Sequence, residues 1–304
     1  MERRHFIKRM GLGSAILGSA GAMSFPSFAE NKAAAVPFKM DFAPHFGMFK
    51  NSAPGGIVDE LKFMADQGFR SLEDNGLLKR SVADQELIGK TLNDLGMRMG
   101  VFVIDGGDNW KVSLTTGKQE FLDVFLKTCR ESAEAAKRVG AKWATVVPGY
   151  FERNLPMGVQ TGNVIEALKR GAEILEPHGL TMVLEPLSDN PDLFLRHADQ
   201  TYMICKAVGS PSCKILYDIY HMQRNEGNLI ATMEKTWSEI AYIQIGDNPG
   251  RKEPGTGEIH YGNVFKYINS KGFTGILGME HGNALPGVDG EKALIEAYRK
   301  VDLA

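Results

Sequence analysis

Cysteine is scarce in this sequence, with three residues in 304, and no two of them are spaced as C-x-x-C. This scarcity argues against a disulfide framework and favours buried thiols at Cys129, Cys205 and Cys213. An excess of basic residues is also absent, because 35 Lys and Arg stand against 37 Asp and Glu. The balanced charge argues against a nucleic-acid partner, which usually contacts a basic surface.

A long apolar run is missing as well. The apolar stretch over residues 10–25 is short and rich in glycine, which does not suit a membrane span. It follows the paired Arg3-Arg4 and precedes the small residues Ser27 to Ala29, an order typical of a secretory signal peptide. The paired arginines resemble a twin-arginine export signal. That resemblance implies export in the folded state to the periplasm; a disordered basic tail or a membrane anchor is the alternative.

These boundaries divide the chain into three parts. We expect a signal peptide over residues 1–29, a linker over residues 30–38 and a single catalytic domain over residues 39–304. Once the signal is removed, no stable association with a membrane is expected.

Short apolar runs alternate with longer stretches of helical period from residue 39 onwards. The strands are predicted at 40–44, 69–72, 98–103, 143–147, 181–184, 214–217, 242–245 and 275–279. The helices are predicted at 57–67, 82–95, 121–139, 163–176, 199–208, 229–236, 263–270 and 291–301. Eight such units in a domain of about 265 residues favour a (β/α)8 TIM barrel. The rival, a doubly wound open sheet, is disfavoured because neither G-x-G-x-x-G after the first strand nor G-x-x-x-x-G-K-[ST] is present.

Each of the last four predicted strands ends in a side chain that carries oxygen. These residues are Glu185, Asp218, Gln244 and Glu280. The carboxyl ends of barrel strands converge on one face, where three unpaired carboxylates would repel one another. A divalent cation resolves this repulsion, and an oxygen-only set suits Mg²⁺ or Mn²⁺, with Co²⁺ as a further candidate. The alternative is that each acid caps a helix or pairs with a nearby base.

Four segments carry a resemblance to a known family. LEPL at 184–187, YDIYHMQ at 217–223, YIQIGDNPGRKEPGTGEI at 242–259 and GMEHG at 278–282 are similar to the hydroxypyruvate isomerase family. That family belongs to the xylose isomerase-like barrels of the sugar isomerase/epimerase superfamily. The resemblance implies that the four strand-end residues bind one divalent metal, and that Glu185 and Glu280 are also the proton donor and acceptor. It further implies that strand-end residues of the first half, including His45 and Glu73, contact the substrate.

Two more residues are candidates for substrate binding. A histidine at the place of His221 holds a substrate oxygen in related epimerases, although a lone loop histidine is often structural. Arg251, after the seventh strand, could hold a carboxylate or hydroxyl in its planar fork, or lie on the surface. The His-rich cluster of a related zinc-dependent endonuclease is not apparent among the seven histidines.

These residues predict an isomerase that interconverts hydroxy-aldehyde and hydroxy-ketone forms of a small acid or sugar through an enediolate. For hydroxypyruvate the product is tartronate semialdehyde. A ketose 3-epimerase, a metal-dependent lyase or dehydratase of keto-sugars or keto-inositols, and a non-catalytic sugar-binding protein stay open as alternatives. The sequence leaves the substrate, the native metal and any homo-oligomer undetermined.

Overall fold

The computed structural model describes residues 35–302. The predicted signal peptide lies outside the described residues, as does most of the predicted linker. Eight strands are present and each overlaps a predicted one: β1 (Phe42–Ala43), β2 (Ser71–Leu72), β3 (Arg98–Met99), β4 (Trp143–Val146), β5 (Thr181–Leu184), β6 (Cys213–Asp218), β7 (Ile240–Gln244) and β8 (Leu277–Gly278). Every strand pair is parallel, as the alternation of strands and helices requires.

The strands follow one another around a barrel. Six of them form a continuous sheet in the order β1-β8-β7-β6-β5-β4, and β2 pairs with β3. Isolated parallel bridges from His45 to Glu73 and from Val103 to Thr145 join the pair to the sheet on both sides. The predicted (β/α)8 fold is therefore confirmed, with its closure across β2 and β3 resting on single bridges.

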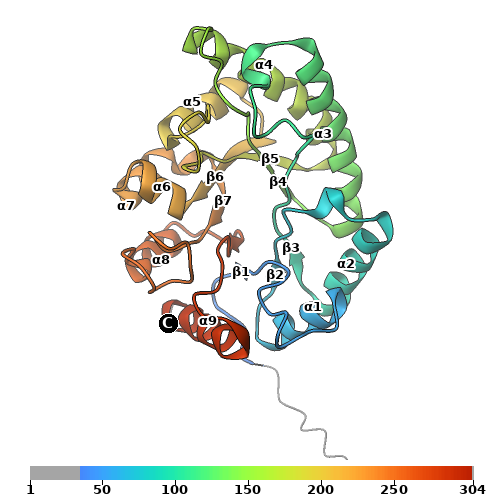
Figure 1. Cartoon of the computed structure of the whole chain (residues 1–304), viewed down its shortest axis with the longest axis vertical. Helices are drawn as coiled ribbons and strands as arrows, with labels where there is room; N and C mark the ends of the chain where they lie inside the picture. The colour runs from blue at the N-terminus through green and yellow to red at the C-terminus, as the bar shows by residue number, and fades with distance from the viewer. Residues whose placement is uncertain (1–34, 303–304) are drawn as a thin grey trace, which may run out of the picture. The chain divides into compact units, whose positions relative to one another are not determined.

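The helices lie around the strands in chain order (Figure 1). They are α1 (Ile57–Asp66), α2 (Val82–Leu95), α3 (Gln119–Val139), α4 (Met157–Leu175), α5 (Ala198–Val208), α6 (Ile219–Asn225), α7 (Leu229–Thr236), α8 (Tyr261–Ser270) and α9 (Gly287–Val301). Four short 3-10 turns, Leu77–Lys79, Leu114–Thr116, Glu176–His178 and Trp237–Glu239, lie between them. Among the described residues, no helix combines the length and apolar character that crossing a membrane requires.

The prediction of eight helices was wrong by one. Helix α6 has seven residues, too few to produce a helical period that can be read from sequence. It follows β6 without a loop, because the side chain of Asp218 caps it and accepts a hydrogen bond from the backbone N–H of His221 at 3.1 Å. The cap places His221 in the first turn of the helix, directly above the end of the strand.

Side chains of the strands alternate between the outer core and the barrel interior. In β6, Ile215 and Tyr217 join the large core beneath the helices, whereas Leu216 joins a smaller buried cluster with Val183 and Tyr242. Asp218, Glu185 and Gln244 each come two residues after a member of this smaller cluster. A strand has a period of two, so these three polar residues also point into the barrel, one layer above the apolar cluster.

The first described residues pack on the barrel. Phe38 is buried, and its ring contacts those of Phe42 and Phe69. The backbone N–H of Phe38 donates to Gly68 O, and the guanidinium of Arg299 in α9 lies over the Phe38 ring. Residues 35–38, the end of the segment that we interpreted as a linker, therefore contact both the start and the end of the barrel.

Candidate functional site

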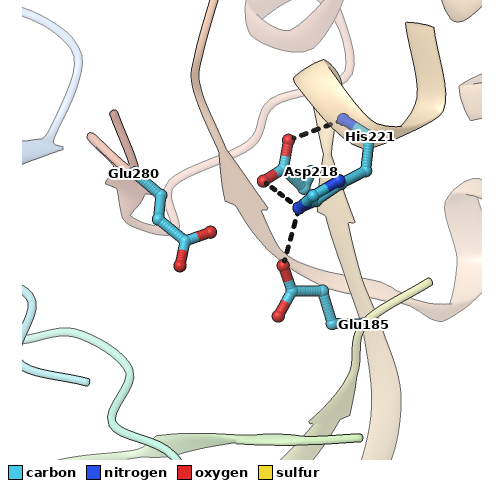
Figure 2. A group of neighbouring side chains, drawn as sticks. All are labelled: Glu185, Asp218, His221 and Glu280. Atoms are coloured by element: carbon cyan, nitrogen blue, oxygen red, sulfur yellow. Dashed lines mark hydrogen bonds and ion pairs between the residues drawn. The ribbon is translucent and has the colours of Figure 1, made fainter. Parts of the chain in front are cut away.

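The four strand-end residues meet at one end of the barrel. Asp218 and Gln244 are register partners in β6 and β7, and Gln244 pairs in turn with Gly278 of β8, two residues before Glu280. Glu185, Asp218 and Gln244 are buried, whereas the Glu280 side chain is 22% exposed. Figure 2 shows Glu280 facing Glu185, Asp218 and His221 across a gap. Three carboxylates thus converge on one space that is open on the Glu280 side.

The donor atoms of this group are spaced to surround a cation. One ligand atom from each of Glu185, Asp218, His221 and Glu280 lies within 4.8 Å of all the others. Oε1 of Glu185 and Oε1 of Gln244 are buried and have no hydrogen-bond partner in the described part of the chain. Buried polar oxygens normally have partners, so these atoms point to a bound group that accepts their lone pairs. A divalent metal that prefers oxygen fits this donor set.

His221 is held so that one ring nitrogen faces the carboxylates. Its Nδ1 accepts a hydrogen bond from the backbone N–H of Ser188 at 3.2 Å and lies 2.8 Å from the Ser188 hydroxyl. Its Nε2 lies 3.8 Å from Glu185, 3.7 Å from Asp218 and 3.0 Å from Nη2 of Arg251, a group that only donates hydrogen bonds. Burial lowers the pKa of His221 and keeps the ring neutral. Because Nε2 lies against the Arg251 guanidinium, we place His221 beside the oxygen set, in contact with Arg251.

Arg251 brings a positive charge into the carboxylate cluster. Its Nη2 lies 2.9 Å from Glu280 Oε2 and 3.3 Å from Asp218 Oδ2, and its Nε donates to the backbone oxygen of Glu280. The guanidinium stacks on the Tyr220 ring at 4.9 Å from the centroid. One edge of the guanidinium therefore offsets the negative charge of Asp218 and Glu280. The Arg251 side chain is still 28% exposed.

The loop after β7 is built to hold Arg251 in this position. The buried carboxylate of Asp247 accepts hydrogen bonds from the backbone N–H groups of Gly255, Gly257 and Ile259. Arg251 itself has a φ of 50°, in the left-handed region that residues with a side chain seldom adopt. Such a conformation persists only where the surroundings enforce it, which is common at functional sites. The loop with the sequence GRKEPGTGEI thus holds the guanidinium of Arg251 in place.

Burial also raises the pKa values of Glu185 and Glu280. Desolvation raises the pKa of Glu280 to about 7, with Arg251 acting in the opposite direction and Asp218 and Glu73 adding to the rise. Desolvation, followed by the charges of Glu280 and Asp218, raises the pKa of Glu185 well above its ordinary value. Perturbed carboxyl groups of this kind are typical of catalytic acids and bases.

The residues predicted from the first half of the barrel lie on the opposite wall. His45 Nε2 is 2.7 Å from Glu73 Oε2, a distance for an ion pair, although the nitrogen is not aligned for a conventional hydrogen bond. Burial acts to lower the pKa of His45, but the charges of Glu73, Glu280 and Asp74 outweigh it and raise that pKa. Glu73 is fully buried, beneath the site rather than at its surface.

Asn75 belongs to the strand-end run Glu73-Asp74-Asn75, which the resemblance assigns to substrate specificity, but its contact with Glu280 was not predicted. Its side-chain N–H donates to Glu280 Oε1 at 2.8 Å, and its own Oδ1 is buried without a partner in the described residues. Its place in a polar run after a predicted strand marks it as a site residue, but does not predict which side chain it contacts. Ser188 is a second such residue, since it follows the Glu185-Pro186 strand end and orients His221.

Comparison with known proteins extends this picture. A family model described as a xylose isomerase-like TIM barrel matches residues 61–301. Hydroxypyruvate isomerase of Escherichia coli is 40% identical over 120 residues, which cover 39% of this chain and 46% of that protein. The 2-oxo-tetronate isomerase of Cupriavidus necator is 28% identical over 247 residues, covering 79% of this chain and 92% of the relative.

A solved structure with the same fold is that of an AP endonuclease, family 2, from Brucella melitensis. It superimposes with a TM-score of 0.71 at 23% identity, over 83% of this chain and 96% of the other. At that identity the likeness concerns the fold alone. The relatives by sequence support an isomerase, the enzyme class expected from the strand-end residues.

Proposed function

Because this chain belongs to the xylose isomerase-like TIM barrel family, we propose that it is a metal-dependent isomerase of a small hydroxy-keto acid, with hydroxypyruvate as the reference substrate. The observation that carries the proposal is the pair Glu185 and Glu280, two carboxyl groups of raised pKa that face each other across an oxygen-rich donor set. The names of the relatives, hydroxypyruvate isomerase and 2-oxo-tetronate isomerase, support a sugar acid as the substrate class.

The metal would be held by Glu185, Asp218, Gln244 and Glu280. Two of these residues offer an oxygen without a partner, and the hard oxygen donors favour Mg²⁺ or Mn²⁺ over softer metals. When bound, the metal supplies Lewis-acid polarisation of the substrate carbonyl and offsets the negative charge that develops on the substrate oxygens.

The reaction moves one proton between neighbouring carbons. In hydroxypyruvate, a carboxylate removes a proton from the hydroxymethyl carbon, the C–H electron pair forms the enediolate double bond, and a proton is delivered to the former carbonyl carbon. The hydroxyl proton passes to the former carbonyl oxygen, so no oxidant or reductant is consumed. Glu185 and Glu280 lie within reach of one shared space, so one can remove the proton and the other can deliver it.

The neighbouring donors orient the substrate in this scheme. His221 lies beside the carboxylates with its Nε2 against Arg251, and Arg251 offers the N–H groups that its ion pairs leave free on the exposed side. Asn75 donates to Oε1 of Glu280, while Oε2 of the same carboxylate lies against Arg251. We place His45 on the wall from which the remaining part of the substrate is recognised.

The test is hydrogen exchange in D₂O. Protein stripped with EDTA and reloaded with Mn²⁺ or Mg²⁺ is incubated with hydroxypyruvate or 2-oxo-tetronate, and the products are followed by NMR. We expect deuterium at the carbon that receives the proton, a change of isomer without loss of water, and no turnover in the stripped protein. Epimerised ketose would favour the epimerase alternative, and release of water would favour a dehydratase. Full activity in protein shown to be metal-free by elemental analysis contradicts the proposal.

A further inference from the structure

One carboxylate inside the barrel is not used by the proposed reaction. Glu73 follows β2 and is fully buried, yet its side chain extends across the barrel toward β8. A Cβ added to Gly278 would lie 1.7 Å from Glu73 Oε1, and one added to Gly100 would lie 3.1 Å from Glu73 Cγ. Glycine is disfavoured within strands unless another group approaches closely. Gly278 and Gly100 therefore leave the space that the Glu73 side chain fills.

Three polar side chains surround the Glu73 carboxylate. The side-chain N–H₂ of Gln244 lies 3.4 Å from Oε1 and 3.3 Å from Oε2, and His45 Nε2 lies 2.7 Å from Oε2. The Tyr242 hydroxyl accepts from the backbone N–H of Val101, and burial together with the charge of Glu73 raises its pKa. A buried carboxylate needs such partners, because an unpaired charge in this environment is very costly.

The consequence concerns the amide of Gln244. An ionised carboxylate only accepts hydrogen bonds, so it can face the nitrogen end of the amide but not the oxygen end. The amide oxygen is thereby turned to the other side, where it is buried and has no partner among residues 35–302. Asp218 of the donor set is the register partner of Gln244 in the neighbouring strand.

We infer that Glu73 is a positioning residue, which fixes the amide of Gln244 so that its oxygen faces the metal. This inference rests on the proposed function, since it takes Gln244 as a ligand. A neutral glutamine at position 73 would present either an oxygen or an N–H₂ group to Gln244 and would remove the preference. Glu73 would thus act as a residue that contacts a metal ligand rather than the metal itself. The loss of such a residue typically lowers metal affinity about 10- to 100-fold.

The experiment measures Mn²⁺ dissociation constants on metal-stripped protein by titration calorimetry, with circular dichroism as the check on folding. The variants are Glu73→Gln, Gln244→Glu and the exchange of the two residues, Glu73→Gln with Gln244→Glu. In the exchanged pair, the amide at 73 donates to one oxygen of the carboxylate at 244 and leaves the other oxygen for the metal. Glu239→Gln is the matched control, because Glu239 is 6% exposed but pairs with Lys206 and Lys214 away from the site.

We expect Glu73→Gln to raise the Mn²⁺ dissociation constant about 10- to 100-fold and the control to leave it unchanged. Gln244→Glu alone places two carboxylates against each other, so we expect the exchanged pair to bind at least about tenfold more tightly than either single variant. An exchanged pair no better than both singles, or wild-type affinity in Glu73→Gln, overturns the inference even if one variant folds poorly. If the wild-type protein binds no Mn²⁺, the proposed function is contradicted as well. Failure of the inference about Glu73 can therefore be distinguished from failure of the proposed function.

Discussion

Glu280→Gln should stabilise the metal-free protein at alkaline pH, although it should also abolish most activity. In the folded protein the Glu280 pKa is about 7, against 4.5 in an unperturbed chain. Between these values the folded state holds a proton that the unfolded state has released. Stability is therefore fully present below about pH 4.5 and is lost as the pH rises through 7.

The size of this effect follows from the pKa. A rise from 4.5 to about 7 corresponds to at most about 3 kcal/mol of lost stability once Glu280 is ionised. The amide of a glutamine stays neutral, so the variant avoids the loss but also gives up the ion pair with Arg251. We expect a net gain of about 1–3 kcal/mol at pH 8, or roughly 2–4 °C in Tm for each kcal/mol.

The assay is differential scanning calorimetry of EDTA-treated protein at pH 5 and pH 8. At pH 5 the folded carboxyl group is still protonated and wild type has lost less than about 1 kcal/mol, so wild type and Glu280→Gln should melt within about 3 °C of each other. Saturating Mn²⁺ at pH 8 should restore wild type more than the variant, since binding stabilises the folded state by mass action. Glu239→Gln, which breaks two lysine contacts, should lose stability at both pH values. The reasoning is refuted if Glu280→Gln melts no higher than wild type at pH 8.

Four further predictions test other parts of the site. Glu185→Gln should lower kcat by about 10²- to 10⁴-fold at saturating Mn²⁺, with occupancy verified by elemental analysis; near-normal kcat would leave Glu185 as a ligand only. Asp218→Ala should lose most of the thermal stabilisation that Mn²⁺ gives to wild type, and an undiminished Tm gain would contradict its role as a ligand. Gly278→Ala should weaken Mn²⁺ binding by displacing Glu73, whereas Gly158→Ala, where an added Cβ meets nothing within 4 Å, should not. Replacing Arg3 and Arg4 by lysine should prevent the export that we propose for this chain, as measured by fractionation of cells that express the tagged full-length protein; unchanged export excludes the twin-arginine route.

The order of strands could be predicted because each strand has a clear apolar run and a polar end. In β6 the apolar run Ile215, Leu216 and Tyr217 ends at Asp218, and the geometry of a barrel brings such strand ends to one face. The starts of α4 and α9 were harder to predict, since Met157 and Gly287 precede the first strongly periodic residues. Helix α6 was missed because a seven-residue helix depends on its cap at Asp218 rather than on a pattern.

Part of the site could not be predicted from sequence. The pattern correctly places Glu73 at the end of a strand, like the other acids. It does not predict that the Glu73 side chain passes Gly100 and that its carboxylate ends beside Gly278. That arrangement depends on two glycines from other strands, and spacing along the chain carries no information about them. For the same reason, the contact of Asn75 with Glu280 only emerges once β2 and β8 lie near each other in the barrel.

The two halves of the barrel differ in how firmly they hold their residues. From β4 to β8 the strands form continuous ladders, in which Gln244 is paired with Asp218 on one side and Gly278 on the other. The backbone N–H of Glu185 donates to Val146 O just beyond the β4–β5 ladder. The wall with His45 and Asn75 is joined to this sheet through β1 and through single bridges. Catalytic groups require positions accurate to a fraction of an ångström, whereas substrate contacts tolerate variation from one enzyme to the next. We therefore expect the chemistry to be set by strands β5 to β8, and the choice of acid or sugar by the loops after β1 and β2.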